Sequence, residues 1–144
     1  MIVIASDHDG YDLKHSLIAH LRGQGLDVSD LGPPEKARCD YPDYAAKVAQ
    51  AVAGQAQTLG ILCCGTGIGM AMAANKVHGV RAAVCSDTFS AHSTREHNDA
   101  NVLCLEERVV GPGLAADIVD AFLSTAFEGG RHANRVQKMM DLEG

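Results

Sequence analysis

Residues 59–70 read LGILCCGTGIGM: a largely apolar run over Leu59–Cys63 leads directly into a segment with glycines at positions 65, 67 and 69. A short apolar run bounded by glycines is typical of a buried β-strand. The glycines allow the backbone to turn sharply from that strand into a helix. The first N–H groups of a helix have no partners within it, so the sequence predicts a cradle of amide donors for an anion at this point.

Similar apolar runs occur on both sides of this segment, separated by helix-like stretches. We expect strands over Ile2–Ala5, Leu26–Leu31, Leu59–Cys63, Val80–Cys85 and Asn101–Leu105. Strands that alternate with helices are typical of βαβ units, and nearly continuous hydrophobicity is typical of parallel strands covered on both faces. The sequence therefore predicts an α/β fold, a Rossmann-like three-layer α-β-α sandwich with a five-stranded parallel sheet.

The helices are predicted from apolar spacing and from glycine and proline positions. Before Gly23, apolar residues recur at spacings of three and four, at Leu13, Leu17, Ile18 and Leu21. That spacing places them on one face of a helix. Pro42 and Pro112 suit the first turns of two further helices, and a last helix is expected after Gly129-Gly130.

Length and composition limit the possible classes of protein. With 144 residues, 47% of them hydrophobic, we expect a single domain over residues 1–144. A net charge of −6 argues against a nucleic-acid surface, which needs a basic face. No stretch approaches the roughly 18 apolar residues of a membrane span, and the N-terminus carries no charged leader. We therefore expect no membrane partner and a cytoplasmic location.

The five cysteines agree with a reducing compartment, since their number is odd and none forms a CxxC motif. Disulfides and a structural zinc site are therefore not expected. Cys63, Cys85 and Cys104 lie in apolar runs, where a thiol behaves as a small hydrophobic side chain. Cys64 differs because it directly precedes the glycines, at the carboxyl end of a predicted strand.

Ligands of open parallel sheets bind beyond the carboxyl ends of the strands, which directs attention to Cys64. Neighbouring side chains of a strand point to opposite faces, so only one of Cys63 and Cys64 can face a cleft. The positive end of the following helix would favour a thiolate at Cys64. From the residues alone, a base beside amide donors and a buried structural thiol both remain open. A dinucleotide site is disfavoured, because Met70 replaces the last glycine of the G-x-G-x-x-G pattern.

Six motifs stand out along the chain. They are Ser6-Asp7-His8, Asp40-Tyr41-Pro42, Cys64-Gly65-Thr66-Gly67-Ile68-Gly69, Ala74-Asn75-Lys76, Arg95-Glu96-His97-Asn98-Asp99, and Gly129-Gly130-Arg131-His132 followed by Arg135. Together they resemble the type B ribose-5-phosphate isomerases, within a wider group that includes galactose-6-phosphate and allose-6-phosphate isomerases. The resemblance covers nearly the whole chain.

The resemblance implies an aldose–ketose isomerase of the pentose phosphate pathway that needs no metal and no cofactor. It implies that Cys64 moves a proton between C2 and C1 of ribose 5-phosphate, with the Thr66 hydroxyl assisting at the oxygens. The resulting cis-enediolate would rest on amides of the glycine-rich segment. The residues that would contribute these amides are Gly65, Gly67, Ile68, Gly69 and Met70.

The same resemblance assigns the remaining site residues. His97 would open the furanose ring, since a histidine accepts and donates protons near neutral pH. Asp7, Tyr41 and Asn98 would contact the sugar. Arg131 and Arg135 lie one turn apart on the last predicted helix, and the resemblance implies that they hold the phosphate together with Arg108 and His8. It also implies a homodimer, sometimes paired into tetramers, whose active sites are shared between subunits.

Two residues depart from the family pattern, and three alternatives stay open. Asp9 stands where relatives usually carry a small apolar residue, and Cys63 replaces an aliphatic one. Asp9 adds negative charge near the expected substrate, so the identity of the sugar is less firmly predicted than the reaction. A six-carbon aldose phosphate or a free sugar is the first alternative. A non-catalytic sugar-phosphate sensor is the second, and a zinc hydrolase using Asp7, His8 and His97 is the third.

Overall fold

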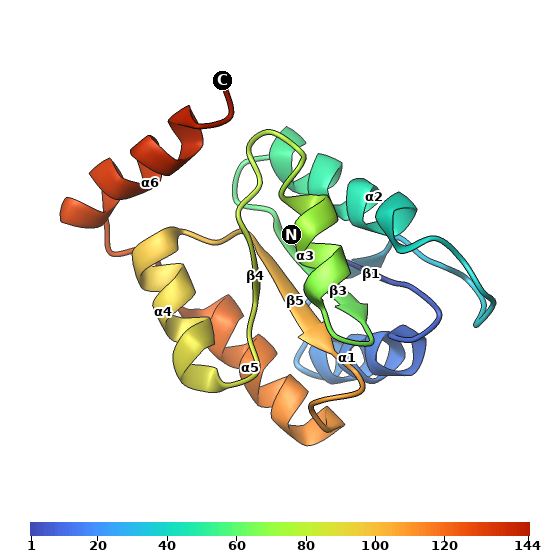
Figure 1. The fold of residues 1–144 in the computed structure, drawn as a ribbon. Helices are drawn as coiled ribbons and strands as arrows, with labels where there is room; N and C mark the ends of the chain where they lie inside the picture. Colours follow the sequence, from blue (N-terminus) through green and yellow to red (C-terminus); the bar gives the residue numbers. More distant parts are fainter.

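The computed structural model describes residues 1–144 and contains one five-stranded parallel sheet with helices on both faces (Figure 1). The strands are β1 (Ile2–Ser6), β2 (Val28–Asp30), β3 (Leu59–Cys64), β4 (Ala82–Val84) and β5 (Val102–Glu106). The helices are α1 (Tyr11–Gly23), α2 (Tyr41–Gly54), α3 (Ile68–Ala74), α4 (Thr88–Asn98), α5 (Pro112–Ser124) and α6 (Arg131–Asp141). The predicted α/β sandwich with five parallel strands is confirmed.

The strand order is β2-β1-β3-β5-β4. Every pair is parallel, and all five strands fall within or beside the predicted apolar runs. The two edge strands, β2 and β4, are three residues long and so shorter than predicted. An edge strand pairs on one side only, which leaves the ends of its apolar run outside the ladder.

Helices cover the two faces of the sheet as separate layers. The apolar sides of α1 and α5 pack on one face, where Leu17 and Phe122 are fully buried. The apolar side of α2 packs with α3 on the other face, around residues such as Val48 and Met70. None of the helices combines the length and the apolar composition that crossing a membrane would require.

The chain switches direction at the carboxyl ends of β1 and β3. These strands are neighbours in the sheet, but α1 follows β1 on one face and α3 follows β3 on the other. Such a switch opens a crevice between two strand ends. Gly10, which precedes α1, approaches β3 so closely that an added Cβ would lie 2.3 Å from the carbonyl carbon of Cys63.

The last helix, α6, lies apart from the two layers and contacts α4 (Figure 1). It is strongly amphipathic, yet His132 is its only buried residue. The predicted helix after Gly129-Gly130 is thus confirmed, with Arg131 as its first residue. In Figure 1, α6 lies at the top of the view, whereas the arrowhead of β5 points to the bottom.

Candidate active site

Cys64 is the last residue of β3, and its sulfur contacts the glycine-rich loop that follows. The amide of Gly67 donates a hydrogen bond to Sγ of Cys64 at 3.0 Å. The side chain of Cys64 belongs to the core cluster on the α2 and α3 face, whereas that of Cys63 belongs to the opposite cluster. Cys64 keeps 6% of its surface exposed, and Cys63 keeps none. The predicted separation of the two thiols is confirmed.

The other cysteines in apolar runs are buried as predicted. Cys85 is 2% exposed and Cys104 is fully buried. Burial raises the pKa of the Cys85 thiol to about 11 and that of the Cys104 thiol well above its ordinary value. Burial also raises the pKa of the Cys63 thiol strongly. These three groups therefore remain protonated thiols at neutral pH.

Two backbone amides of the glycine-rich loop donate hydrogen bonds to nearby side chains. The amide of Ile68 donates to Oγ1 of Thr66 at 3.3 Å, while the amide of Gly67 is held by Cys64. Gly67 has a φ of +75°, a left-handed conformation that glycine adopts without steric cost. The loop therefore aims two amides at the side chains expected to do the chemistry. The side chain of Met70 is buried, so this residue can offer substrate only its backbone.

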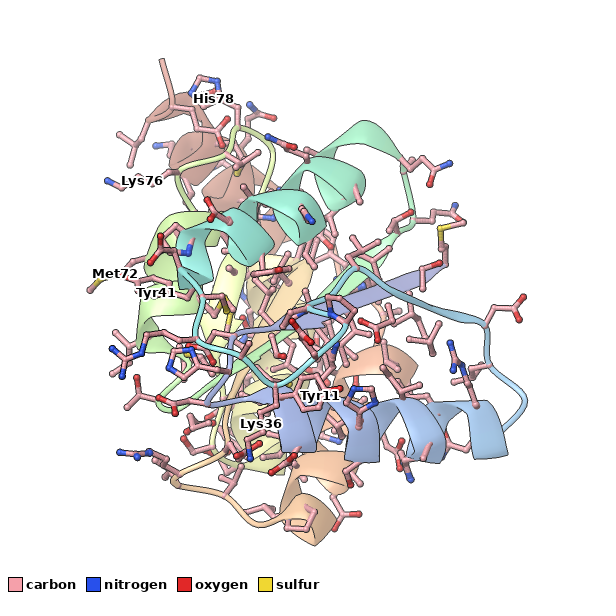
Figure 2. All side chains as sticks on the ribbon, turned by 90° about the vertical axis from the view of Figure 1, so that its right-hand side faces the viewer. Tyr11, Lys36, Tyr41, Met72, Lys76 and His78 are labelled. Atoms are coloured by element: carbon pink, nitrogen blue, oxygen red, sulfur yellow. The ribbon has the colours of Figure 1, made fainter.

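Tyr41 packs its ring against the start of α3. A Cβ on Gly69 would lie 2.7 Å from Cε1 of Tyr41, so only glycine leaves room for the ring. Tyr41 is 42% exposed and lies on the same side of the molecule as Met72 of α3 (Figure 2). The first turns of α2 and α3 thereby form one wall beside the loop of Cys64.

The loop after β1 forms the facing wall. Asp7 is 7% exposed, and its Oδ1 accepts a hydrogen bond from the amide of Gly10 at 3.0 Å. Nδ1 of His8 accepts from the amide of Cys39 at 3.4 Å, which joins this loop to the segment before α2. Nε2 of His8 lies 4.0 Å from Oδ1 of Asp9.

Arg108 enters from the loop after β5. Its amide donates to the carbonyl of Gly65 at 3.1 Å, and its Cδ lies 3.4 Å from where a Cβ on Gly65 would stand. We call the residues around the carboxyl ends of β1, β3 and β5 the carboxyl-end cluster. Its members are Asp7, His8, Tyr41, Cys64, Gly65, Thr66, Gly67, Ile68, Gly69, Met70 and Arg108.

The other predicted site residues lie at the opposite end of the strands, near their amino ends. His97 and Asn98 are the last two residues of α4, and the short connection to β5 ends at Asn101. The amide of Gly60, near the start of β3, donates to the carbonyl of Asn101 at 2.9 Å. Arg131 and Arg135 lie on the exposed first turns of α6. We call His97, Asn98, Arg131 and Arg135 the amino-end cluster.

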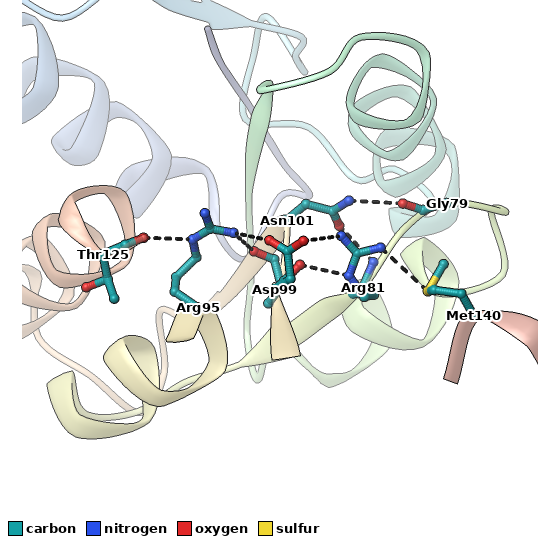
Figure 3. Close-up of polar contacts among 8 residues, drawn as sticks. Gly79, Arg81, Arg95, Asp99, Asn101, Thr125 and Met140 are labelled. Atoms are coloured by element: carbon teal, nitrogen blue, oxygen red, sulfur yellow. Dashed lines mark hydrogen bonds and ion pairs between the residues drawn. The ribbon is translucent and has the colours of Figure 1, made fainter. Parts of the chain in front are cut away.

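A network of polar contacts fixes this end of α4 (Figure 3). Asp99 caps the helix with a φ of +49° and accepts from Arg95 at 3.2 Å, while Arg81 lies 3.5 Å from its other oxygen. Arg95 also donates to the carbonyl of Thr125, and Arg81 reaches Sδ of Met140 in α6. The network thus holds the end of α4 and the body of α6 in one arrangement.

The two clusters are too far apart to act on one small sugar within a single chain. Cys64 ends the six-residue strand β3, and the contacts of Gly60 place the amino-end cluster near its start. A strand of that length spans about 17 Å, since each residue adds about 3.3 Å. The structure therefore brings the predicted site residues together as two groups and not as one.

Comparisons with known proteins identify the family of this chain. The model of the ribose/galactose isomerase family matches residues 2–139. The chain belongs to this family. Ribose-5-phosphate isomerase B of Escherichia coli is 51% identical over 142 residues, which cover 99% of this chain and 95% of that protein.

Solved structures of relatives superpose closely on this member of the ribose/galactose isomerase family. Ribose-5-phosphate isomerase B of Clostridium thermocellum is 52% identical with a TM-score of 0.95, covering 99% of this chain and 96% of the other. The enzyme of Mycoplasma genitalium, solved with bound ribulose 5-phosphate, is 48% identical with a TM-score of 0.95, covering 99% and 95%.

One group of potential metal ligands lies in this family member. Ligand atoms of His97, Glu128 and His132 lie within 4.8 Å of one another. The rings of His97 and His132 stack with centroids 4.3 Å apart. Burial, followed by the charge of Arg131, lowers the pKa of His132. A cation here would meet two arginines and the positive end of α6, so the position suits an anion better. Asp7 and His8 lie in the other cluster, which separates the zinc ligands of the hydrolase alternative.

Sequence patterns did not identify two buried charged residues of this isomerase-family chain. Glu106 is 3% exposed and lies opposite Cys64 in the ladder of β3 and β5. It accepts a hydrogen bond from the hydroxyl of Ser86. Lys14 is fully buried and donates to Asp30 at 2.9 Å. The signal for Glu106 is an acidic residue that directly follows an apolar strand run. Lys14 carries no such signal, since charged residues on helices are usually exposed.

Proposed function

We propose that this protein is an aldose–ketose isomerase that interconverts D-ribose 5-phosphate and D-ribulose 5-phosphate. The observation that carries the proposal is the 3.0 Å hydrogen bond from the amide of Gly67 to Sγ of Cys64 at the carboxyl end of β3. This hydrogen bond fixes the sulfur beside the amides of the glycine-rich loop, where a proton-transferring group and oxyanion donors can act on one substrate. The close similarity to ribose-5-phosphate isomerases supports the choice of substrate.

The chemistry is a proton transfer between neighbouring carbons. The Cys64 thiolate removes the C2 proton of the open-chain aldose. The electrons of that C–H bond form a C1–C2 double bond while the π electrons of the C1 carbonyl move onto O1, which gives a cis-enediolate. The thiol then returns the proton to C1 to give the ketose. Thr66, one residue past Gly65, assists proton movement between the two oxygens. The amides of the loop stabilise the enediolate charge, as preorganised donors do for an oxyanion.

Ring opening and sugar recognition involve both clusters. His97 deprotonates the anomeric hydroxyl of the furanose and donates a proton to the ring oxygen. Asp7, Tyr41 and Asn98 contact the sugar. His8, Arg108, Arg131 and Arg135 hold the phosphate, and no side-chain ion pair within the chain engages the three guanidinium groups.

The separation of the clusters supports a homodimer with shared active sites. The amino-end cluster lies about a strand length from Cys64 of its own chain, so another chain has to supply it. In a two-fold dimer the same contact occurs twice, so His97 and the arginines of the partner subunit would complete each of two equivalent sites. Two such dimers can associate as a tetramer without changing this arrangement.

The direct test is to mix the purified protein with ribose 5-phosphate and follow formation of ribulose 5-phosphate, before and after treatment with EDTA. We expect turnover that EDTA does not change. Absence of turnover in an otherwise folded protein would reject the proposed reaction, and loss of turnover with EDTA would reject its independence of metals.

A six-carbon aldose phosphate is the main alternative substrate. The same base and amides would serve it, and only the reach between Cys64 and the phosphate ligands differs. Side-by-side kcat/KM values for ribose 5-phosphate, allose 6-phosphate and galactose 6-phosphate decide between them. We expect the highest value for ribose 5-phosphate.

A further inference from the structure

Asp9 lies between two of the groups proposed to bind the phosphate. Its Oδ1 is 4.0 Å from Nε2 of His8. Its Oδ2 is 3.5 Å from the position of a Cβ on Gly65, and Cδ of Arg108 is 3.4 Å from the same position. The carboxylate and the stem of Arg108 therefore both cover the Cα of Gly65, directly after the proposed base.

Basic side chains lie close to Asp9. His8 is on one side and the stem of Arg108 on another. The pKa of the nearby Lys36 is raised mainly by its hydrogen bond to Asp12 and only to a smaller extent by the charge of Asp9. Lys36 itself is paired with Asp12 at 2.7 Å. The side chain of Asp9 is 46% exposed and accepts no hydrogen bond from a backbone amide, so it does not hold the fold of its loop.

We infer that Asp9 sets how strongly this site prefers a phosphorylated sugar over an unphosphorylated one. This inference rests on the proposed function. The carboxylate offsets the positive charge of Arg108 and repels an incoming phosphate dianion. It does not repel an uncharged sugar, and it can accept a hydrogen bond from one of its hydroxyls. Asp9 thus weakens discrimination in favour of the phosphate ester.

The test compares Asp9→Asn with the wild-type protein on ribose 5-phosphate and on unphosphorylated ribose. Asn keeps the shape of the side chain and removes its charge. We expect kcat/KM for ribose 5-phosphate to rise about tenfold, mainly through KM, and kcat/KM for ribose to stay level or fall. The gain should shrink in high salt, because ions screen the repulsion.

Asp12→Asn is the matched control. It removes the same charge three positions along the chain, from a side chain paired with Lys36. For this variant, we expect the ratio of kcat/KM for ribose 5-phosphate to kcat/KM for ribose to differ from the wild-type ratio by less than about twofold. An equal gain in both variants would assign the effect to net charge and overturn the role of Asp9, as would an unchanged ratio in Asp9→Asn.

Calorimetric titration with inorganic phosphate separates this inference from the proposed reaction. We expect Asp9→Asn to bind inorganic phosphate about tenfold more tightly than the wild-type protein does, whether or not ribose 5-phosphate is turned over. A wild-type protein without isomerase activity would reject the proposed function alone. Equal phosphate affinity in the two proteins would reject the role of Asp9.

Discussion

The amide of Gly67 donates a hydrogen bond to Sγ of Cys64 at 3.0 Å, although Gly67 belongs to the loop and Cys64 to the strand. The left-handed φ of Gly67 turns its N–H back toward the strand that the chain has just left. The sulfur is thereby bonded to a donor before any substrate binds.

Replacing Cys64 by Ala should abolish turnover and largely spare binding. Removal of a proposed proton-transferring base costs about a thousandfold or more in kcat, while the phosphate and hydroxyl contacts remain. Steady-state kinetics measures kcat, and a binding titration with ribose 5-phosphate measures Kd separately. Cys63→Ala is the control: its side chain is on the other face and should affect the free energy of unfolding, by about 1 kcal/mol, and leave kcat nearly unchanged. Similar kcat losses in both variants would argue against Cys64 as the base.

Mixing two inactive variants should restore activity if sites are shared. Cys64→Ala and His97→Asn each remove one proposed function from a different cluster. A mixed dimer then has one site with both defects and one with neither. Random exchange makes about half of the dimers mixed, so about a quarter of wild-type activity should return. Activity is measured after the variants are denatured and refolded together.

The control for this experiment is a mixture of Cys64→Ala with Thr66→Ala, whose changes lie in the same cluster. That mixture should regain no activity, because every site of a mixed dimer carries one defect. Complementation in the control, or none with His97→Asn, would contradict a shared site.

Gly10→Ala should prevent folding or reduce the free energy of unfolding by about 4 kcal/mol or more. The new Cβ would stand 2.3 Å from the backbone carbonyl of Cys63, in the central strand, where neither side can give way. Gly23→Ala has nothing within 4 Å of its Cβ and lies at the end of α1. It should raise the free energy of unfolding by about 0.5 kcal/mol. Denaturant titration of both variants checks the contrast, and equal effects would refute the close approach.

His132 should make the protein less stable in mild acid. Burial and the charge of Arg131 lower its pKa in the folded state below the ordinary value of 6.5. The unfolded chain therefore takes up a proton at a higher pH than the folded protein does. Stability from this group is complete above about pH 6.5 and is lost as the pH falls from there toward the folded pKa. His132→Phe keeps a flat ring and cannot titrate.

Thermal unfolding of wild type and His132→Phe between pH 7 and 5 tests this expectation. The Tm of the variant should fall less steeply with acidification than that of the wild type. Equal slopes would mean that other groups cause the acid sensitivity.

The apolar runs and the polar, glycine-rich segments between them predicted the sheet, because each strand is a continuous apolar run between polar loops. They could not predict the ends of β2 and β4, where pairing on one side decides which residues join the ladder. The helix α4 has no long apolar stripe, since Ala91 and Thr94 are its only buried residues. Its position follows from the connection between β4 and β5 and not from its own sequence.

The sequence predicted which residues form the candidate site and did not predict how they are arranged in space. Glycine spacing pointed to the loop of Cys64, and family motifs supplied His97 and the arginines. Which end of the sheet each group occupies depends on the direction of α4, which runs antiparallel to the strands and carries His97 away from Cys64. The burial of Lys14 depends on Asp30 and the carbonyl of Pro33, contacts made through the fold.

The alternation of side chains along β3 also affects how the cysteines of this protein react with oxidants. Because Cys63 and Cys64 point into different core clusters, their sulfurs cannot bond to each other without breaking the strand. A peroxide that reaches the partly exposed sulfur of Cys64 would leave a sulfenic acid with no neighbouring thiol on the same strand to resolve it. Of the other thiols, only that of Cys104 shares the core cluster of Cys64, and it is fully buried, so we expect reduction by a small thiol from outside the chain.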